Sequence, residues 1–194
     1  MELRPSAEDD DKKTSRVKKM QAKPYNVLFL CTGNSARSVM AEALITTLGQ
    51  GRFIGYSAGS HPTGKVNPFA IEMIAQTGYD LSQLSSKSWD EFALPATLGT
   101  STAPEMDFII TVCGNAAGEA CPYWPGQPAT AHWGYEDPAA VVGTDEQKRA
   151  AFHKVFQQIA ARTRLFVALP LASLDALAIQ RELKTIGDTT TVVQ

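Results

Sequence analysis

The sequence has few cysteines, almost no net charge and no long hydrophobic run. Its 194 residues include 18 basic and 20 acidic side chains, which give a formal net charge of −2 at pH 7. This balance offers no electrostatic basis for binding nucleic acid or an anionic membrane. No apolar stretch approaches the roughly 18 residues that indicate a membrane span. Partners of those two kinds are therefore not expected.

The N-terminal region also lacks the marks of a targeting segment. It has no apolar core of the kind that a secretory signal carries, and its acidic run at 8–11 argues against a transit peptide. The chain has three cysteines, an odd number. Without a signal, three cysteines indicate reduced thiols rather than a disulfide framework. We therefore expect a cytoplasmic protein.

The length fits one domain with a buried core, and the composition is ordinary, with 44% hydrophobic and 20% charged residues. Residues 1–23 are charged and lack periodicity, which predicts a disordered tail. Residues 24–185 are expected to form a single catalytic α/β domain. Within it, 170–185 should be an additional C-terminal helix, and 186–194 a second tail.

Strand and helix patterns alternate along this domain. Apolar runs predict strands at 26–30, 52–57 and 107–112, with a further short segment at 129–133. Helical spacing of apolar residues predicts helices at 36–48, 68–77, 145–167 and 174–184. Residues 93–104 and 114–127 should be loops because they are rich in small residues and proline. This alternation predicts a parallel α/β sheet.

The stretch VLFLCTGNSARS at 27–38 contains the strongest functional signal. It places Cys31 at the end of a strand and Arg37 at the start of the next helix. Backbone amides at such a junction can form an anion-binding nest, with Gly33 permitting a tight path and short polar side chains holding the loop. The guanidinium can grip two oxygens of a tetrahedral anion, and the positive field should lower the Cys31 pKa. The alternative is a cysteine packed in the core beside a solvated arginine.

Residues 31–38, CTGNSARS, followed by MAEA at 40–43, closely resemble the phosphate-binding loop of the low-molecular-weight protein tyrosine phosphatase superfamily. Within it the chain is most similar to the thiol-dependent arsenate reductases. The resemblance covers about residues 25–168, including YSAGS at 56–60 and HWGYEDP at 132–138. It implies a four-stranded parallel sheet flanked by helices. It also implies an oxyanion-binding loop made of Thr32, Gly33, Asn34, Ser35, Ala36, Arg37 and Ser38.

The resemblance assigns an acid/base role to Asp137, which precedes Pro138. A helix cap is the plain structural alternative, and the two roles can coexist. Many arsenate reductases of this kind carry a cysteine where this chain has Ala36. That cysteine is not a member of their usual relay, so the difference is minor.

The other two cysteines separate the possible reactions. TVCGNAAGEACP at 111–122 resembles the reductases' segment with two redox cysteines, here Cys113 and Cys121. The resemblance implies that Cys31 attacks arsenate, Cys113 then attacks Cys31, and Cys121 takes over the disulfide. Thioredoxin, or glutathione with glutaredoxin, would restore the thiols. Alternatively, Cys113 fills the core and Cys121 is an incidental loop thiol.

Three other interpretations remain open. A phosphatase acting on phosphotyrosine or another phosphomonoester is the main one, although Ala139 and Ala140 stand where tyrosine phosphatases usually place an aromatic wall. A thiol-based redox sensor or oxyanion-binding module is another. Zinc at Cys113, Cys121 and His132 lacks a standard spacing. The resemblance also suggests a potassium ion held by Asn34, Glu42, Ser88 and Asp90.

Overall fold

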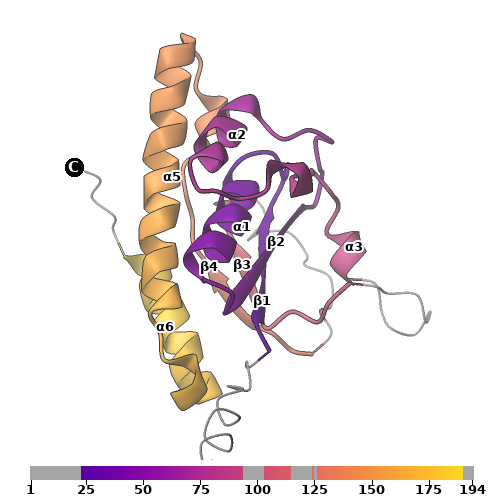
Figure 1. Ribbon diagram of the computed structural model, residues 1–194, viewed down its shortest axis with the longest axis vertical. Helices are drawn as coiled ribbons and strands as arrows, with labels where there is room; N and C mark the ends of the chain where they lie inside the picture. The colour runs from indigo at the N-terminus through magenta and orange to yellow at the C-terminus, as the bar shows by residue number, and fades with distance from the viewer. Residues whose placement is uncertain (1–22, 94–102, 115–123, 125, 190–194) are drawn as a thin grey trace, which may run out of the picture.

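The centre of the protein is a four-stranded sheet in which all strands are parallel. The computed structural model describes residues 23–93, 103–114, 124 and 126–189. The strand order is β2-β1-β3-β4 (Figure 1). The strands are β1 (Tyr25–Cys31), β2 (Phe53–Gly59), β3 (Phe108–Thr111) and β4 (Ala129–His132). The predicted fold, a four-stranded parallel sheet flanked by helices, is confirmed.

Three helices pack together on one face of the sheet: α1 (Arg37–Leu48) lies directly on the strands, and α2 (Pro68–Ala75) and the long α5 (Asp145–Val167) pack on α1 and on each other (Figure 1). Each of the latter two begins at a clear signal. Pro68 opens α2 after Asn67, whose side chain accepts from Phe69 N. Thr144 and Gln147 form a reciprocal capping box at the start of α5. These starts explain why the two helices could be predicted closely.

The remaining elements are short except for the C-terminal helix. The order includes η1 (Leu81–Gln83), α3 (Asp90–Ala93), η3 (Pro138–Ala140), η4 (Leu171–Ser173) and α6 (Ala176–Asp188). The one-turn helix α3 was not predicted. The C-terminal helix runs past 185, so the boundary predicted for the second tail is wrong by three residues. Of the predicted tails and the two loops, residues 1–22, 94–102, 115–123, 125 and 190–194 lie outside the described residues.

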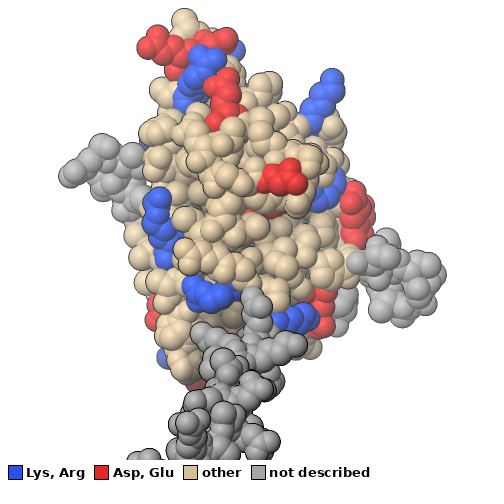
Figure 2. Space-filling model, in the orientation of Figure 1, with Lys and Arg blue, Asp and Glu red and all other residues tan. Residues whose placement is uncertain are grey.

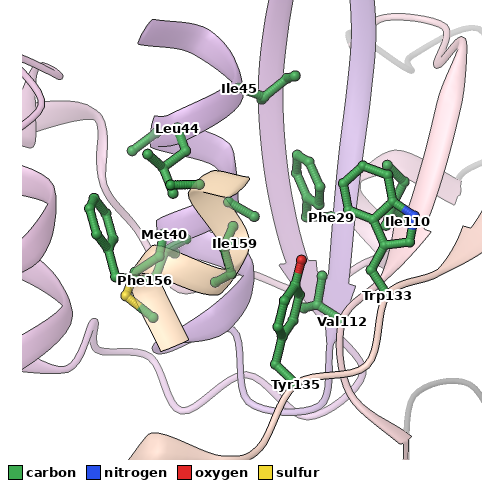
Figure 3. Packing of buried hydrophobic residues seen from close by; sticks show 14 of the residues in the cluster. Phe29, Met40, Leu44, Ile45, Ile110, Val112, Trp133, Tyr135, Phe156 and Ile159 are labelled. Carbon is green, nitrogen blue, oxygen red and sulfur yellow. The ribbon is translucent and has the colours of Figure 1, made fainter. Parts of the chain in front are cut away.

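The alternation along β1 divides the core between the two faces of the sheet. Val27, Phe29 and Cys31 face a large cluster formed with α1 and α5, whereas Leu28 and Leu30 face a smaller one. Figure 3 shows the large cluster, with Phe29 and Ile110 from the strands opposite Met40 and Ile159 from the helices. Because β1 is covered on both faces, its apolar run is unbroken.

The surface agrees with the small net charge. On the face drawn in Figure 2, acidic and basic side chains lie scattered around a largely uncharged area. Among the residues that the structure describes, no helix is both long and apolar enough to cross a membrane.

Candidate active site

The loop between β1 and α1 turns its carbonyls outward. Backbone N–H groups from the segment after β2 hold them there: His61 N donates to Thr32 O (2.9 Å), Thr63 N to Gly33 O (3.0 Å) and Asn67 N to Ser35 O (2.8 Å). With these carbonyls turned away, the Asn34 amide faces the Cys31 sulfur inside the turn. Helix α1 begins directly after the loop, and its N-cap residue Ala36 supplies no side-chain cap. The arrangement is a nest suited to an oxyanion.

Two residues other than the expected glycine give this loop its shape. The left-handed backbone belongs to Asn34, with φ of 42°, and not to Gly33. Asn34 is completely buried. At the end of β2, a Cβ on Gly59 would overlap Thr32 O and lie 3.0 Å from Asn34 N. The tight backbone path expected at Gly33 thus depends on the left-handed conformation of Asn34, and the closest approach between the two segments requires the glycine at position 59.

The Cys31 sulfur receives hydrogen bonds from the loop. Asn34 N donates to it at 3.1 Å, and the Ser38 hydroxyl lies 2.9 Å away. Lys87 N donates to Asn34 Oδ1 at 2.7 Å, which fixes the orientation of that amide. Asn34 Nδ2 then donates to Ser38 Oγ at 2.9 Å. The Ser38 hydroxyl proton is thereby left for the sulfur, the direction that stabilises a thiolate.

Burial nevertheless raises the pKa of the Cys31 thiol above its ordinary value, although hydrogen bonds from Ser38 and Asn34 act against this rise. The neighbouring Cys113 also raises it. The expected lowering by Arg37 is wrong for this arrangement of the loop. Arg37 Nη2 lies 2.8 Å from Asp137 Oδ2, so its charge is paired with a carboxylate rather than directed at the sulfur.

Asp137 and Arg37 meet at the mouth of the loop. The Arg37 side chain is 14% exposed and that of Asp137 is 44% exposed. Arg37 Nη1 also donates to Tyr135 O at 3.2 Å. Asp137 Oδ1 accepts from Ala139 N at 3.1 Å and so caps η3. The capping role is thus confirmed, and the other carboxylate oxygen remains directed at the loop.

Cys113 lies beside the loop, two residues after the end of the neighbouring strand β3. The β1–β3 register pairs Leu30 with Thr111, and Val112 N donates to Leu30 O at 2.8 Å. Cys113 therefore comes one residue beyond the level of Cys31, at the same edge of the sheet. Its sulfur is 3.6 Å from Thr32 Oγ1, and both cysteines are 3% exposed and belong to the large core cluster. Cys121 lies outside the described residues.

The four residues suggested for potassium do not form one site. Asn34 Nδ2 and Glu42 Oε2 meet through the Ser57 hydroxyl, which accepts from Asn34 at 2.9 Å and donates to Glu42 at 2.5 Å. Ser88 Oγ instead donates to the exposed Asp90 at 3.1 Å. Near Glu42 Oε2 stands the Lys87 ammonium, at 4.0 Å. The residues present do not fit a potassium ion, because a resident cation already faces the carboxylate.

Sequence reasoning missed Ser57, Lys87 and Tyr79, whose hydroxyl donates to Glu42 Oε1 at 2.7 Å. Burial raises the pKa of Glu42, and Lys87 opposes this rise.

The zinc interpretation involved Cys113, Cys121 and His132. The Nδ1 atom of His132 is 2.8 Å from Thr111 Oγ1. Within the described ranges, no group of three His, Cys, Asp or Glu side chains could hold a metal ion.

The fold and this loop define a family. The family model described as low molecular weight phosphotyrosine protein phosphatase matches residues 26–180. The chain therefore belongs to the low molecular weight phosphotyrosine protein phosphatase family.

Several of its relatives within that family are arsenate reductases. The chain is 38% identical over 140 residues to an arsenate reductase of Halalkalibacterium halodurans, a match that covers 72% of this chain and 93% of the relative. Among solved structures, an arsenate reductase in the phosphate binding state superposes with a TM-score of 0.57 at 31% identity, covering 74% of this chain and 97% of that one. A thioredoxin-dependent arsenate reductase of Corynebacterium glutamicum gives 0.54 at 25% identity, covering 80% and 66%.

Proposed function

We propose that this chain reduces arsenate to arsenite, with Cys31 as the nucleophile. The observation that carries the proposal is the position of Cys113. Its buried thiol stands beside the oxyanion loop, at the end of the strand next to that of Cys31. A hydrolase has no use for a second thiol there, whereas a reductase needs one. The named activity of the relatives supports the same reaction.

The first step forms a bond between sulfur and arsenic. The Cys31 thiolate attacks bound arsenate while the loop amides and Arg37 stabilise the anion. One arsenate oxygen leaves as water after Asp137 has supplied a proton. The incoming anion competes with Asp137 for Arg37, because Arg37 Nη2 lies 2.8 Å from Asp137 Oδ2.

The second step transfers two electrons to arsenic. The Cys113 thiolate attacks the Cys31 sulfur, the sulfur–arsenic bond breaks with its electron pair on arsenic, and arsenite departs. A Cys31–Cys113 disulfide remains, which requires the two Cα atoms to come within about 7 Å. Cys121 then attacks Cys113, releasing Cys31 as a thiolate. An external dithiol reduces the Cys113–Cys121 disulfide.

Thioredoxin, or glutathione with glutaredoxin, is the external reductant in this proposal, and such a cycle belongs in the cytoplasm. The thioredoxin dependence of the Corynebacterium relative favours the first. Hydrolysis of phosphomonoesters is the second candidate function, because phosphate and arsenate share shape and charge. Ala139 and Ala140 are exposed after Pro138, and neither offers a phenyl ring an aromatic wall. Phosphotyrosine is therefore disfavoured.

Replacing each cysteine with serine tests the proposal, with arsenate reduction and aryl phosphate hydrolysis as the two assays. Cys31→Ser should lose both activities, since serine is a far poorer nucleophile at neutral pH. Cys113→Ser should lose reduction and keep hydrolysis, because water can attack a phosphocysteine. Cys121→Ser should release about one arsenite per enzyme and stop with a Cys31–Cys113 disulfide, which mass spectrometry can map.

Two outcomes would contradict the proposal. Sustained arsenate turnover at the wild-type rate in both Cys113→Ser and Cys121→Ser would rule out the relay. Hydrolysis without arsenate reduction in the wild type, with either reductant supplied, would make the chain a phosphatase.

A further inference from the structure

Arg162 is a buried arginine on α5 that bonds to two distant segments of backbone. The residue is only 9% exposed. Nη1 donates to Gly134 O at 3.0 Å, and Nη2 donates to Thr189 O at 3.0 Å. Its guanidinium carbon lies 4.7 Å from the centre of the Tyr135 ring. Burying a charge is costly unless it is hydrogen-bonded, and here two backbone carbonyls and an aromatic face supply its partners.

One of those two segments leads directly to Asp137. Arg162 binds the carbonyl of Gly134, and Arg37 binds the next carbonyl, that of Tyr135. The second arm of Arg37 reaches Asp137. The Tyr135 side chain belongs to the large core cluster, and its ring is drawn next to Val112 in Figure 3. Hydrogen bonds from the two arginines thus hold two consecutive carbonyls of the backbone, just before Asp137, whose carboxylate faces the oxyanion loop.

The other segment is the end of α6. Residues 132–137, which lead to Asp137, are called the acid segment. The indole of Trp133 donates to Leu183 O at 3.0 Å, which holds the start of the acid segment against the same helix. Leu183 and Ile186 are the buried residues of α6. A Cβ on Gly187 would lie 2.5 Å from His132 O and 2.8 Å from Trp133 Cδ1, so the last turn of α6 rests on this segment. The family match ends at residue 180, before that turn.

We infer that Arg162, held by the C-terminal end of α6, is a positioning residue for Asp137. Removing its bonds would let the backbone at Gly134 and Tyr135 relax, and the carboxylate would no longer be aimed at the leaving oxygen. The loop amides come from other elements, so anion binding would be largely retained. This inference rests on the acid/base role given to Asp137 in the proposed function.

The test uses Arg162→Met, which keeps much of the side-chain volume and removes both hydrogen bonds. The single-turnover rate of arsenite release from the fully reduced chain is measured against arsenate concentration and pH. We expect the maximal rate to fall about tenfold or more, with half-saturation changed less than about threefold and a shifted pH profile. Arg164→Met, on an exposed arginine two residues along α5, is the matched control and should behave as wild type.

The same measurement in an Asp137→Asn background separates positioning from general damage. If Arg162 acts through Asp137, its loss should cost little there, and the two effects will not multiply. An equal cost in both backgrounds, or a wild-type rate and pH profile in Arg162→Met, would overturn the inference. If Arg162→Met does not fold, Arg162→Lys keeps the charge and one bond, and its rate should lie between those of the wild type and Asp137→Asn; a wild-type rate and pH profile in Arg162→Lys would then overturn the inference.

Failure of the proposed function gives a different result. If Asp137→Asn alone has the wild-type rate, the acid/base assignment itself is wrong and the positioning role falls with it. If Asp137→Asn is slow and Arg162→Met is not, only the inference about Arg162 is wrong.

Discussion

At the scale of single residues, the Cys31 sulfur is subject to two opposing effects. Burial raises its pKa, and hydrogen bonds from the loop lower it. Arg37 does not contribute while it is paired with Asp137. The reactivity of this thiol therefore depends on a few donors whose orientation is fixed by Asn34 and Lys87.

Ser38→Ala removes the donor to the sulfur that a substitution can delete most cleanly. Because the hydroxyl lowers the Cys31 pKa, its loss should raise that pKa further and reduce the thiolate fraction at neutral pH. We expect alkylation by iodoacetamide at pH 7 to slow roughly fivefold, the equivalent of about 1 kcal/mol. The rate measured against pH should show a midpoint moved upward.

Ser60→Ala is the control for that experiment, because the Ser60 hydroxyl bonds His61 Nδ1 at 3.1 Å rather than the sulfur. Its alkylation profile should match the wild type. An unchanged midpoint in Ser38→Ala would mean that the hydroxyl does not donate to the thiolate.

The limits of sequence reasoning are clear at this scale. Cys31 and Arg37 could be predicted because the strand, loop and helix that position them are contiguous. Lys87 could not, since its partner Asn34 lies 53 residues away and the bond uses its backbone N–H. The Cys31 pKa was also predicted in the wrong direction, because burial and the Arg37–Asp137 pair depend on tertiary contacts.

At the scale of elements, the segment after η1 supports the loop from behind. Gly59 N donates to Lys87 O, and Trp89 N donates to Gly59 O, so this segment pairs in parallel alongside the end of β2. The Lys87 ammonium then faces Glu42, which is on α1 and 4% exposed. Burial raises the pKa of Glu42, so folding favours its protonated form, and the ionised form needs this cation.

Lys87→Met should therefore destabilise the protein in a pH-dependent way. A larger fraction of Glu42 is ionised at pH 8 than at pH 5, and in the variant that carboxylate has lost its counter-charge. The free energy of unfolding should fall by about 1–3 kcal/mol. At pH 5 a larger fraction of Glu42 is protonated, and the loss should be smaller. Thermal or urea unfolding at the two pH values measures the difference.

Lys65→Met serves as the control, because Lys65 is exposed and outside this network. An equal loss of stability at both pH values in Lys87→Met would show that the ammonium acts by packing and not by charge.

Exchanging potassium for sodium at constant ionic strength should leave the wild-type rate of arsenate reduction unchanged.

At the scale of the whole molecule, α6 connects the edge of the sheet to α5. It packs on β4, the last strand of the sheet, and on α5 (Figure 1). Gln180 Nε2 donates to Thr130 O at 2.5 Å, and the Trp133 indole donates to Leu183 O. The spacing of apolar residues in the sequence predicts a helix at 174–184. Its contact with the acid segment was not predictable, because it depends on a small residue that allows close approach.

Gly187→Ala gives a prediction whose sign separates local propensity from this contact. In an exposed helix the change should stabilise by about 1 kcal/mol, because alanine is the better helix former. Here the new Cβ would meet His132 O and Trp133, which are backbone and a buried ring that cannot move cheaply. We therefore expect a loss of about 1–3 kcal/mol in the free energy of unfolding. Thr185→Ala, on the exposed face of the same helix, should be neutral or slightly stabilising. Urea unfolding of the two variants decides the matter: a stabilised Gly187→Ala would mean that α6 does not rest on the acid segment.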